Sequence, residues 1–253
     1  MFTPGPDKLS WMHLKIVLKD KTCFLNIIAI TNICIELGFW PLHFKISLTI
    51  IIPKLNKSSY NSPKLFRLIV LLNTTGKLIK KVISDRLLFH AITNNSIHHS
   101  QLRGLKFKSI IDADIALTHF ICMGWVKYMS TSTLAFNIAQ FFPFFNHHLL
   151  SLILIKASVD SCIVKFFSSY LVNRRTQYVW NNFSSHFIDI NVGVGQGLAL
   201  SPILLAFYLA FFLHILENWL KNLNLQISLL SFVDDGLLIT QSKSFETSNS
   251  CLY

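Results

Sequence analysis

A short stretch near the C-terminus decides the fold: residues 229–239 read LLSFVDDGLLI, with two adjacent acids, Asp234 and Asp235, between two apolar runs. The runs have the length and composition of β-strands, and Asp-Asp-Gly is typical of a tight turn. The stretch therefore predicts a β-hairpin with both acids at its tip. Two carboxylates held at one edge suit a hard divalent cation such as Mg²⁺. The alternative is a solvated turn without chemistry, because turns favour Asp and Gly for backbone reasons alone.

The composition around this stretch is apolar and basic. The 253 residues allow one large domain or two modest ones. Only 14% of them are charged and the mean hydropathy is +0.48, which is high for a soluble protein. The net charge is +11, and residues 54–108 contain eleven Lys and Arg against the single acid Asp85, so this segment alone carries +10. Such a segment predicts a polyanionic partner: nucleic acid, nucleotide phosphates or an acidic membrane surface.

The cysteines, histidines and apolar stretches indicate the compartment of the protein and whether it binds metal through histidine or spans a membrane. The five cysteines are scattered and odd in number, which favours a reduced intracellular protein, nuclear or cytoplasmic. The histidine pairs 98–99 and 147–148 have no carboxylate or cysteine at ligand spacing, so we expect ordinary polar positions there. The apolar stretches 24–42 and 203–216 are interrupted or short, and the N-terminus has no signal-peptide pattern. No membrane partner is expected, and a polytopic membrane protein is the weakest alternative.

Hydrophobic periodicity predicts helices and strands in an irregular order, which is typical of the α+β class. The expected helices cover residues 8–42, 77–94, 109–129, 147–156 and 162–171, and a further helix opens at Ser201 and Pro202; the expected strands cover 46–52, 65–72, 132–138, 178–180 and 188–194. The clearest helix is 77–94, with one apolar stripe and a largely separate basic face.

Seven segments follow one another in a specific order: TPGPD at 3–7, IPK at 52–54, RLIVLLN at 67–73, QLRG at 101–104, AFNIAQFFP at 135–143, GVGQGLALSP at 193–202 and FVDD at 232–235. In this order and at this spacing they resemble the motifs of the reverse transcriptase domain of non-LTR (LINE-type) retrotransposons, particularly those of fungi. The resemblance runs from about residue 3 to the end. It implies a right-hand polymerase fold, with an N-terminal extension and fingers at 1–130 and a partial palm at 131–253. The reverse transcriptase domain as a whole is expected from about residue 45 to 253.

The resemblance also implies a chemistry: RNA-directed DNA synthesis from an RNA template, a DNA primer and deoxynucleoside triphosphates, with two Mg²⁺ ions at the reacting phosphate. By resemblance, the metal ligands are Asp234 and Asp235, and the nucleotide-binding residues are Lys54, Arg67, Phe142, Gln196 and Gly197. The two cations would reach the triphosphate, the glycine-flanked Gln196 would line the nucleotide pocket, and Phe142 would wall the sugar. Taken singly, each residue also has an ordinary structural interpretation.

Four positions depart from the family pattern in a shared way, and a fifth, Gly195 in place of the family's Pro, departs separately. The first palm motif should supply a carboxylate that bridges both metals, and Asn137 stands there instead. A neutral amide in this place costs several kcal/mol of transition-state stabilisation, on the order of a thousandfold in rate. Leu68, Arg103 and Leu198 stand where the family has Pro, Gly and Ser. All four changes can arise from single C·G to T·A transitions, so we expect a decayed copy whose activity is doubtful.

The sequence ends 18 residues after Asp235. From this we expect a thumb domain to be absent, and without a thumb we do not expect processive synthesis. The alternative from another class is a remnant that binds nucleic acid through the basic segment without catalysis.

Overall fold

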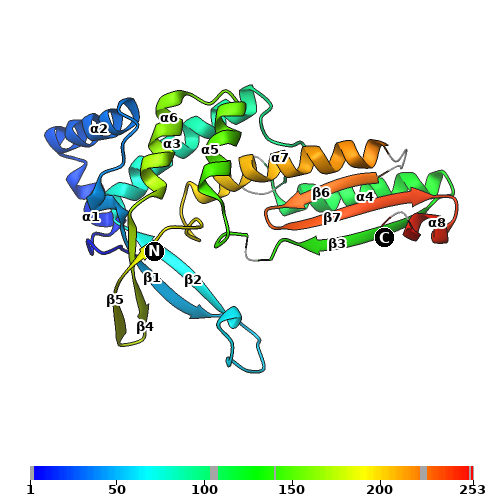
Figure 1. Cartoon of the computed structure of the whole chain (residues 1–253), viewed down its shortest axis with the longest axis horizontal. Helices are drawn as coiled ribbons and strands as arrows, with labels where there is room; N and C mark the ends of the chain where they lie inside the picture. The colour runs from blue at the N-terminus through cyan, green and yellow to red at the C-terminus, as the bar shows by residue number, and fades with distance from the viewer. Residues whose placement is uncertain (1–2, 103–107, 140, 223–226, 251, 253) are drawn as a thin grey trace. The chain divides into compact units, whose positions relative to one another are not determined.

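The computed structural model describes residues 3–102, 108–139, 141–222, 227–250 and 252 (Figure 1). The chain forms two compact units, and each unit combines two stretches of sequence. Unit 1 comprises Met1–Leu87 and Phe142–Ser201, and unit 2 comprises Leu88–Phe141 and Pro202–Tyr253. These units are defined by contacts within each of them, so the division into fingers at 1–130 and palm at 131–253 stays a prediction.

Unit 1 contains a four-stranded mixed sheet in the order β2-β1-β4-β5. Its strands are β1 (Ile46–Pro53), β2 (Phe66–Leu72), β4 (Arg174–Trp180) and β5 (Phe183–Ile190). β1 pairs antiparallel with β2, from Ser47 opposite Leu72 to Pro53 opposite Phe66, and it pairs parallel with β4. The isoleucine-rich sequence of β1 suits a strand with neighbours on both sides. The two predicted strands at 46–52 and 65–72 are confirmed.

The helices of unit 1 enclose an aromatic core. They are α1 (Trp11–Val17), α2 (Lys21–Glu36), the first part of α3 (Thr74–Thr93), α5 (His147–Lys156) and α6 (Ser161–Leu171), with the 3-10 turns η1 (Leu42–Lys45) and η2 (Pro63–Leu65). Trp40 is fully buried, and its ring centroid lies 5.1 Å from that of Phe44 and 5.4 Å from that of Phe166. Aromatic rings at such separations contribute packing beyond the area that they bury.

The helical region predicted at 8–42 consists of two helices rather than one. The break falls between α1 and α2, where the Asp20 side chain accepts a hydrogen bond from the backbone N–H of Cys23 at 2.8 Å. This carboxylate caps the first turn of α2, because an Asp in extended conformation satisfies an N–H that has no partner within the helix. A second correction concerns the strand predicted at 188–194. β5 ends at Ile190, and Gly193 with φ +70° redirects the chain three residues later.

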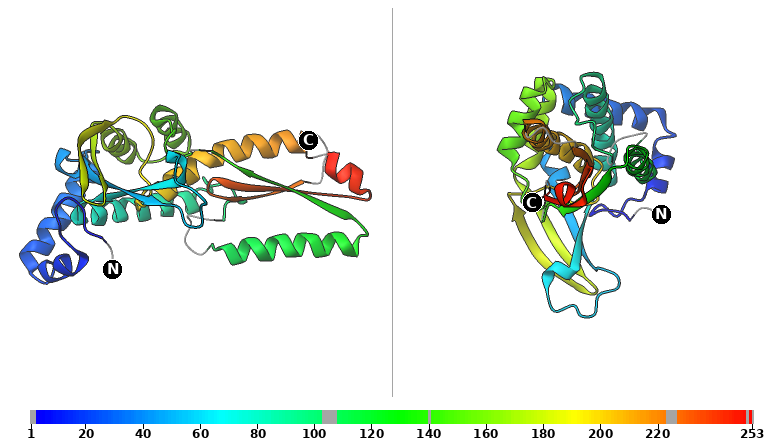
Figure 2. Two further views of the ribbon diagram at one scale, coloured as in Figure 1. Left: turned by 90° about the horizontal axis from the view of Figure 1, so that it is seen from below. Right: turned by 90° about the vertical axis from the view of Figure 1, so that its right-hand side faces the viewer.

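Unit 2 contains a three-stranded antiparallel sheet in the order β3-β7-β6. Its elements are α4 (Ile110–Val126), β3 (Ser130–Asn137), α7 (Ser201–Asn222), β6 (Ile227–Phe232), β7 (Asp235–Ser242) and α8 (Phe245–Ser250), with the end of α3. The sheet lies between α7 and α4 (Figure 2). α4 begins at a capping box, in which Ser109 and Asp112 satisfy one another's backbone N–H groups.

The core of unit 2 depends on α7. Its buried apolar side chains are Ile203, Leu204, Leu205, Ala206, Phe207, Leu209, Ala210, Leu213 and Leu220. Among the described helices, the part of α7 from Ser201 to Leu220 is long and apolar enough to cross a membrane, and half of it is buried inside the protein. The core helix of a soluble protein passes the same test, so this single helix is weak evidence for a membrane protein.

Candidate active site

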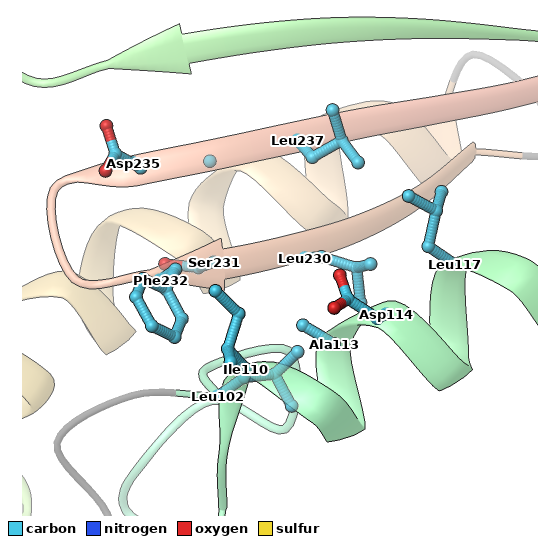
Figure 3. A pocket seen from close by; sticks show the side chains of 11 residues that line it. Leu102, Ile110, Ala113, Asp114, Leu117, Leu230, Ser231, Phe232, Asp235 and Leu237 are labelled. Carbon is cyan, nitrogen blue, oxygen red and sulfur yellow. The ribbon is translucent and has the colours of Figure 1, made fainter.

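The Asp-Asp stretch forms the predicted β-hairpin. β6 and β7 pair from Ile227 opposite Thr240 to Phe232 opposite Asp235, which leaves a two-residue loop of Val233 and Asp234. Asp234 is therefore in the turn and half-buried, whereas Asp235 is exposed as the first residue of β7 (Figure 3). The backbone carbonyl of Asp234 accepts a hydrogen bond from the N–H of Ile138 at 2.7 Å, so the turn is attached to the chain that leaves β3.

The turn holds Val233 in an unfavourable backbone conformation. Its φ is +68°, and a β-branched residue rarely adopts the left-handed region because its side chain crowds the backbone. Glycine is the usual residue at the first position of a two-residue hairpin loop with positive φ. Strain of this kind costs on the order of 1–3 kcal/mol and persists only where surrounding contacts enforce it. Here the ladder on both sides and the Ile138–Asp234 hydrogen bond enforce it.

Asn137 lies beside the acids. It is the last residue of β3 and pairs with Asp235 across the β3–β7 ladder. Its side-chain Nδ2 donates a hydrogen bond to Oδ1 of Asp235 at 2.6 Å. Two motifs that are 98 residues apart in sequence are thus in direct contact. An aspartate at position 137 would instead place a second carboxylate against Asp235, an arrangement that a cation has to neutralise.

These residues carry the kinds of group that a divalent metal site uses. Asp234 and Asp235 supply two carboxylates on adjacent residues, and in the described part of the chain neither forms an ion pair. Carboxylate oxygens are the ligands that hard cations prefer. Asn137, however, turns an N–H group rather than an oxygen toward Asp235. The donor set fits one divalent cation held by the two acids and lacks the third carboxylate that would bridge a pair.

A cavity of about 240 Å³ borders the hairpin within unit 2 (Figure 3). α4 contributes Ile110, Ala113, Asp114 and Leu117, and the hairpin contributes residues 230–232 and 235–237. The lining is almost entirely apolar, with Asp114 and Asp235 as its acids. The cavity therefore gives Asp235 an apolar neighbourhood on the side of α4.

The predicted nucleotide-binding residues all belong to unit 1. Lys54 directly follows β1, where its N–H donates to the carbonyl of Leu65 at 2.8 Å, and Arg67 is exposed on β2. Neither side chain forms an ion pair among the described residues. Two cations on an antiparallel strand pair, with no acid to neutralise them, can bind phosphate oxygens.

The Gln196 loop lies along β2. The backbone of Gln196 bridges to Ile69, and its carbonyl accepts a hydrogen bond from the N–H of Val70 at 3.1 Å. Gly197 has φ +88°, which only glycine adopts without strain. The structure thus brings Gln196 and Gly197 to the strand that carries Arg67, as the predicted nucleotide pocket requires. Their roles in binding stay predictions.

Phe142 joins the same loop through its backbone. It is half-buried, and its carbonyl accepts a hydrogen bond from the N–H of Val194 at 2.9 Å. Asn137, only five residues earlier, belongs to unit 2. The predicted site residues therefore fall into two groups, the acids with Asn137 in unit 2 and the phosphate, base and sugar residues in unit 1. Arg103, one of the departures from the family pattern, is outside the described residues.

Sequence reasoning missed Arg174, which fixes the start of the Gln196 loop. Its guanidinium is buried and donates from Nη2 to the carbonyl of Gly193 at 2.8 Å and to that of Val192 at 3.1 Å. His147 Nε2 lies 2.8 Å from the same Gly193 oxygen. Burial lowers the pKa of Arg174 below its ordinary value, while Tyr170 opposes this shift. The Arg174-Arg175 dipeptide in sequence gives no sign that one member is a buried anchor.

Residues 52–249 match the profile of the family described as reverse transcriptase (RNA-dependent DNA polymerase). The match covers most of the chain. This protein belongs to the reverse transcriptase family. The family generally uses divalent metal ions, which agrees with the two acids at the hairpin tip.

Solved structures support the same fold. The apo telomerase of Candida tropicalis truncated from its C-terminal domain superposes with a TM-score of 0.56 and 14% identity, over 83% of this chain and 45% of that one. The telomerase of Candida albicans in complex with a fragment of telomeric RNA superposes with a TM-score of 0.56 and 12% identity, over 81% of this chain and 39% of that one. This reverse transcriptase therefore spans less than half the length of these telomerases. No curated protein matches. The predicted α+β fingers–palm fold is confirmed at this level.

Proposed function

We propose that this reverse transcriptase is the RNA-directed DNA polymerase domain of a non-LTR retrotransposon and that Asn137 makes this copy a poor or inactive catalyst. The hydrogen bond between Asn137 and Asp235 carries this proposal. It places residue 137 next to Asp235, and the resemblance to the non-LTR family implies a third carboxylate at this position. It also shows that the amide already occupies one oxygen of Asp235.

Each of the candidate site residues has a proposed role in binding the metal ion or the nucleotide. Asp234 and Asp235 would hold a divalent cation, of which Mg²⁺ is our proposal; such an ion supplies charge neutralisation for the attacking and leaving oxygens of phosphoryl transfer. Lys54 and Arg67 would bind the triphosphate, and the backbone of the Gln196 loop would approach the nucleotide closely because glycine flanks it. Phe142 would pack against the sugar. The template would be RNA, the primer DNA and the substrates deoxynucleoside triphosphates.

The N-terminal TPGPD segment supports the retrotransposon subtype, because it is an integral part of unit 1. Oδ2 of Asp7 accepts a hydrogen bond from the N–H of Thr74 at 2.9 Å and so caps α3. Gly5 packs against the backbone carbonyl of Leu72 at the end of β2, where a side chain would collide. The TPGPD segment, which is the N-terminal motif of the resemblance, thus packs against α3 and the predicted fingers strand β2.

The departures from the family pattern support decay. Leu68 lies in β2 opposite Ile51 and is partly exposed, and Leu198 is buried next to the Gln196 loop. Both positions tolerate leucine structurally, so nothing in the fold requires the substitutions. Comparison of the gene with sister copies tests their origin: an excess of C·G to T·A transitions supports decay, and an even spread over all substitution types contradicts it.

Primer extension on an RNA template tests the proposal. The chain and its Asn137→Asp variant would each be assayed with Mg²⁺, alone and with a family thumb domain appended after Tyr253. We expect activity only with the aspartate, with a gain on the order of a thousandfold, since one bridging carboxylate is restored. Asn146→Asp is a matched control, because it adds the same charge at the N-cap of α5, where Asp also caps. Equal activity of the parent chain and its Asn137→Asp variant would contradict the proposed defect.

The second candidate function is nucleic-acid binding without catalysis. It is supported by Lys54 and Arg67, which have no acidic partner among the described side chains, within the basic 54–108 segment. This function predicts RNA binding that weakens steeply with salt, needs no Mg²⁺ and is unchanged by Asp234→Asn. Binding that depends on Asp234 would instead favour a catalytic centre.

A further inference from the structure

Four titratable side chains of unit 2 gather where the segment after α3 meets α7. His98 and His99 lie in this segment, and His214 and Glu217 lie three residues apart on α7. The Nε2 atom of His98 is 3.0 Å from Oε2 of Glu217, and the Nε2 atom of His99 is 4.0 Å from Oε1 of the same carboxylate. The ring centroids of His98 and His214 are 4.6 Å apart. The sequence predicted ordinary polar positions at 98 and 99 because no carboxylate lies at ligand spacing, and the structure brings the carboxylate of Glu217 to the pair from 119 residues away.

The cluster brings together atoms that commonly bind transition metals, two imidazole nitrogens and a carboxylate oxygen. One nitrogen each from His98 and His99 and one oxygen from Glu217 lie within 4.8 Å of one another. His98 is almost fully buried, and its other nitrogen, Nδ1, lies 2.6 Å from the hydroxyl of Ser100. The backbone N–H of Ser100 also lies 3.3 Å from this Nδ1. Metal binding at Nε2 requires the tautomer in which Nδ1 carries the proton and donates it to the Ser100 hydroxyl, as metal-ligating histidines donate from their second ring nitrogen.

We propose that His98, His99 and Glu217 form a binding site for a transition-metal ion of the Zn²⁺ class, which fixes the 98–102 segment against the Asp-Asp hairpin. Two imidazoles and one carboxylate are a common three-ligand set for Zn²⁺, and water or His214 completes four-coordination. Mg²⁺ is disfavoured because it prefers oxygen ligands in octahedral geometry. This proposal is independent of the polymerase function.

The distances allow such an ion after small movements. Bonds of about 2.0–2.1 Å in tetrahedral geometry place ligand atoms about 3.3 Å from one another. The 3.0 Å separation of His98 and Glu217 already meets this requirement, and the 4.0 Å separation of His99 and Glu217 needs less than 1 Å of closure. The nitrogens of His98 and His99 lie within 4.8 Å of one another, so rotation of the His99 side chain has to close at most about 1.5 Å there. The His99 side chain is 74% exposed, so it is free to make this movement.

The site is connected to the hairpin through backbone hydrogen bonds. The N–H of Ser231 donates to the carbonyl of Ser100, and the N–H of Leu102 donates to the carbonyl of Ser231, each at 2.9 Å. Ser231 lies on β6, three residues before Asp234. A metal that immobilises His98 and His99 therefore restrains the strand that leads into the acidic turn.

Metal titration of the full chain tests the site. The protein is first treated with a chelator, and Zn²⁺ is then titrated against a competing indicator in millimolar Mg²⁺, which occupies the hairpin acids. We expect one Zn²⁺ per chain and at least tenfold weaker binding in His99→Gln and in Glu217→Gln. His119→Gln removes an exposed histidine of α4 and is the matched control, with unchanged affinity expected. Equal Zn²⁺ affinity in all four proteins overturns the proposal.

Cobalt distinguishes this site from the free cysteines, of which Cys23, Cys34, Cys122 and Cys162 are described. Bound Co²⁺ should show visible absorption of a low-coordinate nitrogen–oxygen site, and a cobalt–thiolate band in the near ultraviolet would refute the assignment. Hydrogen exchange tests the connection to the hairpin: Zn²⁺ should slow exchange of the Ser231 and Leu102 amides at least tenfold. Binding without this protection would overturn the proposed restraint.

Discussion

The contact between Asn137 and Asp235 makes a quantitative prediction for Asn137→Asp that does not depend on catalysis. The substitution replaces a hydrogen bond of 2.6 Å with two facing carboxylates. At that separation, two charges in water repel by about 1.6 kcal/mol. The lost hydrogen bond to a charged group adds about 1.5 kcal/mol at the lower end of its range. Because both residues are exposed, side-chain rotation and salt reduce this total, and we expect a destabilisation of about 1–2 kcal/mol without divalent ions.

The effect of Asn137→Asp on stability should change from destabilising to stabilising when a divalent cation is added. Three carboxylates bind such an ion more tightly than two carboxylates and an amide, and an ion at a hundred times its dissociation constant stabilises the native state by about 2.7 kcal/mol. Urea unfolding of the chain and of Asn137→Asp, in chelator and in Mg²⁺, measures both effects. A difference of 1 kcal/mol corresponds to roughly 2–4 °C in Tm for a chain of this size.

The Asn146→Asp control should show neither effect, because its carboxylate caps α5 rather than facing an acid. If Asn137→Asp has the stability of the parent chain in chelator and gains nothing from Mg²⁺, then residue 137 and Asp235 do not share a cation site. The proposed catalytic defect at residue 137 would then be wrong.

Three further substitutions test other parts of the structure. Lys80 is fully buried, its amine has no hydrogen-bond partner among the described residues, and desolvation, with smaller contributions from Arg174 and Lys77, lowers its pKa well below the ordinary value. The unfolded chain holds this proton up to about pH 10.4, so the free energy of unfolding should rise as the pH rises toward that value. Lys80→Met should therefore stabilise the protein by about 1–3 kcal/mol at pH 7 and by less at pH 10. A difference in urea unfolding that does not change with pH would contradict this. Asp7→Ala should lower the free energy of unfolding by about 1 kcal/mol because it removes the cap of α3, whereas Asp7→Asn should leave it nearly unchanged. Equal destabilisation by the two substitutions would exclude capping as the reason. Val233→Gly should stabilise unit 2 by about 1 kcal/mol in urea unfolding, because it relieves the φ of +68°. Unchanged or lower stability would contradict the assignment of strain to this residue.

Local sequence signals predicted the elements well where the chain is regular. The helix at 147–156 has the predicted bounds, the strands at 46–52 and 65–72 are present, and the hairpin forms around Asp234 and Asp235. Each depends on neighbours in sequence: alternation, apolar runs and turn residues. The error at 188–194 has a local cause too, because Gly193 interrupts a stretch that alternates like a strand.

The missed features depend on residues far apart in sequence. Arg174 reaches a carbonyl 19 residues away, and His98 meets Glu217 across 119 residues. No spacing rule predicts such contacts, because tertiary packing alone brings the segments together. The contact of Asn137 with Asp235 was foreseen only through resemblance to a family, and the pattern of polar residues would not have paired them.

The departures from the family pattern differ in what they disturb. Leu68 restores to β2 a backbone N–H that a proline lacks, and Leu198 is buried to 7% exposure, so both are compatible with the sheet and the core. Asn137 is exposed and changes no packing, yet it removes one of the charges on which metal binding depends. Under the proposed decay, the substitution at residue 137 would change the chemistry of the site without disturbing the fold around it. Under the proposed defect, the chain should still bind RNA through Lys54, which follows β1, and Arg67 on β2, without extending a primer. The salt dependence of RNA binding, measured beside primer extension, separates these two properties.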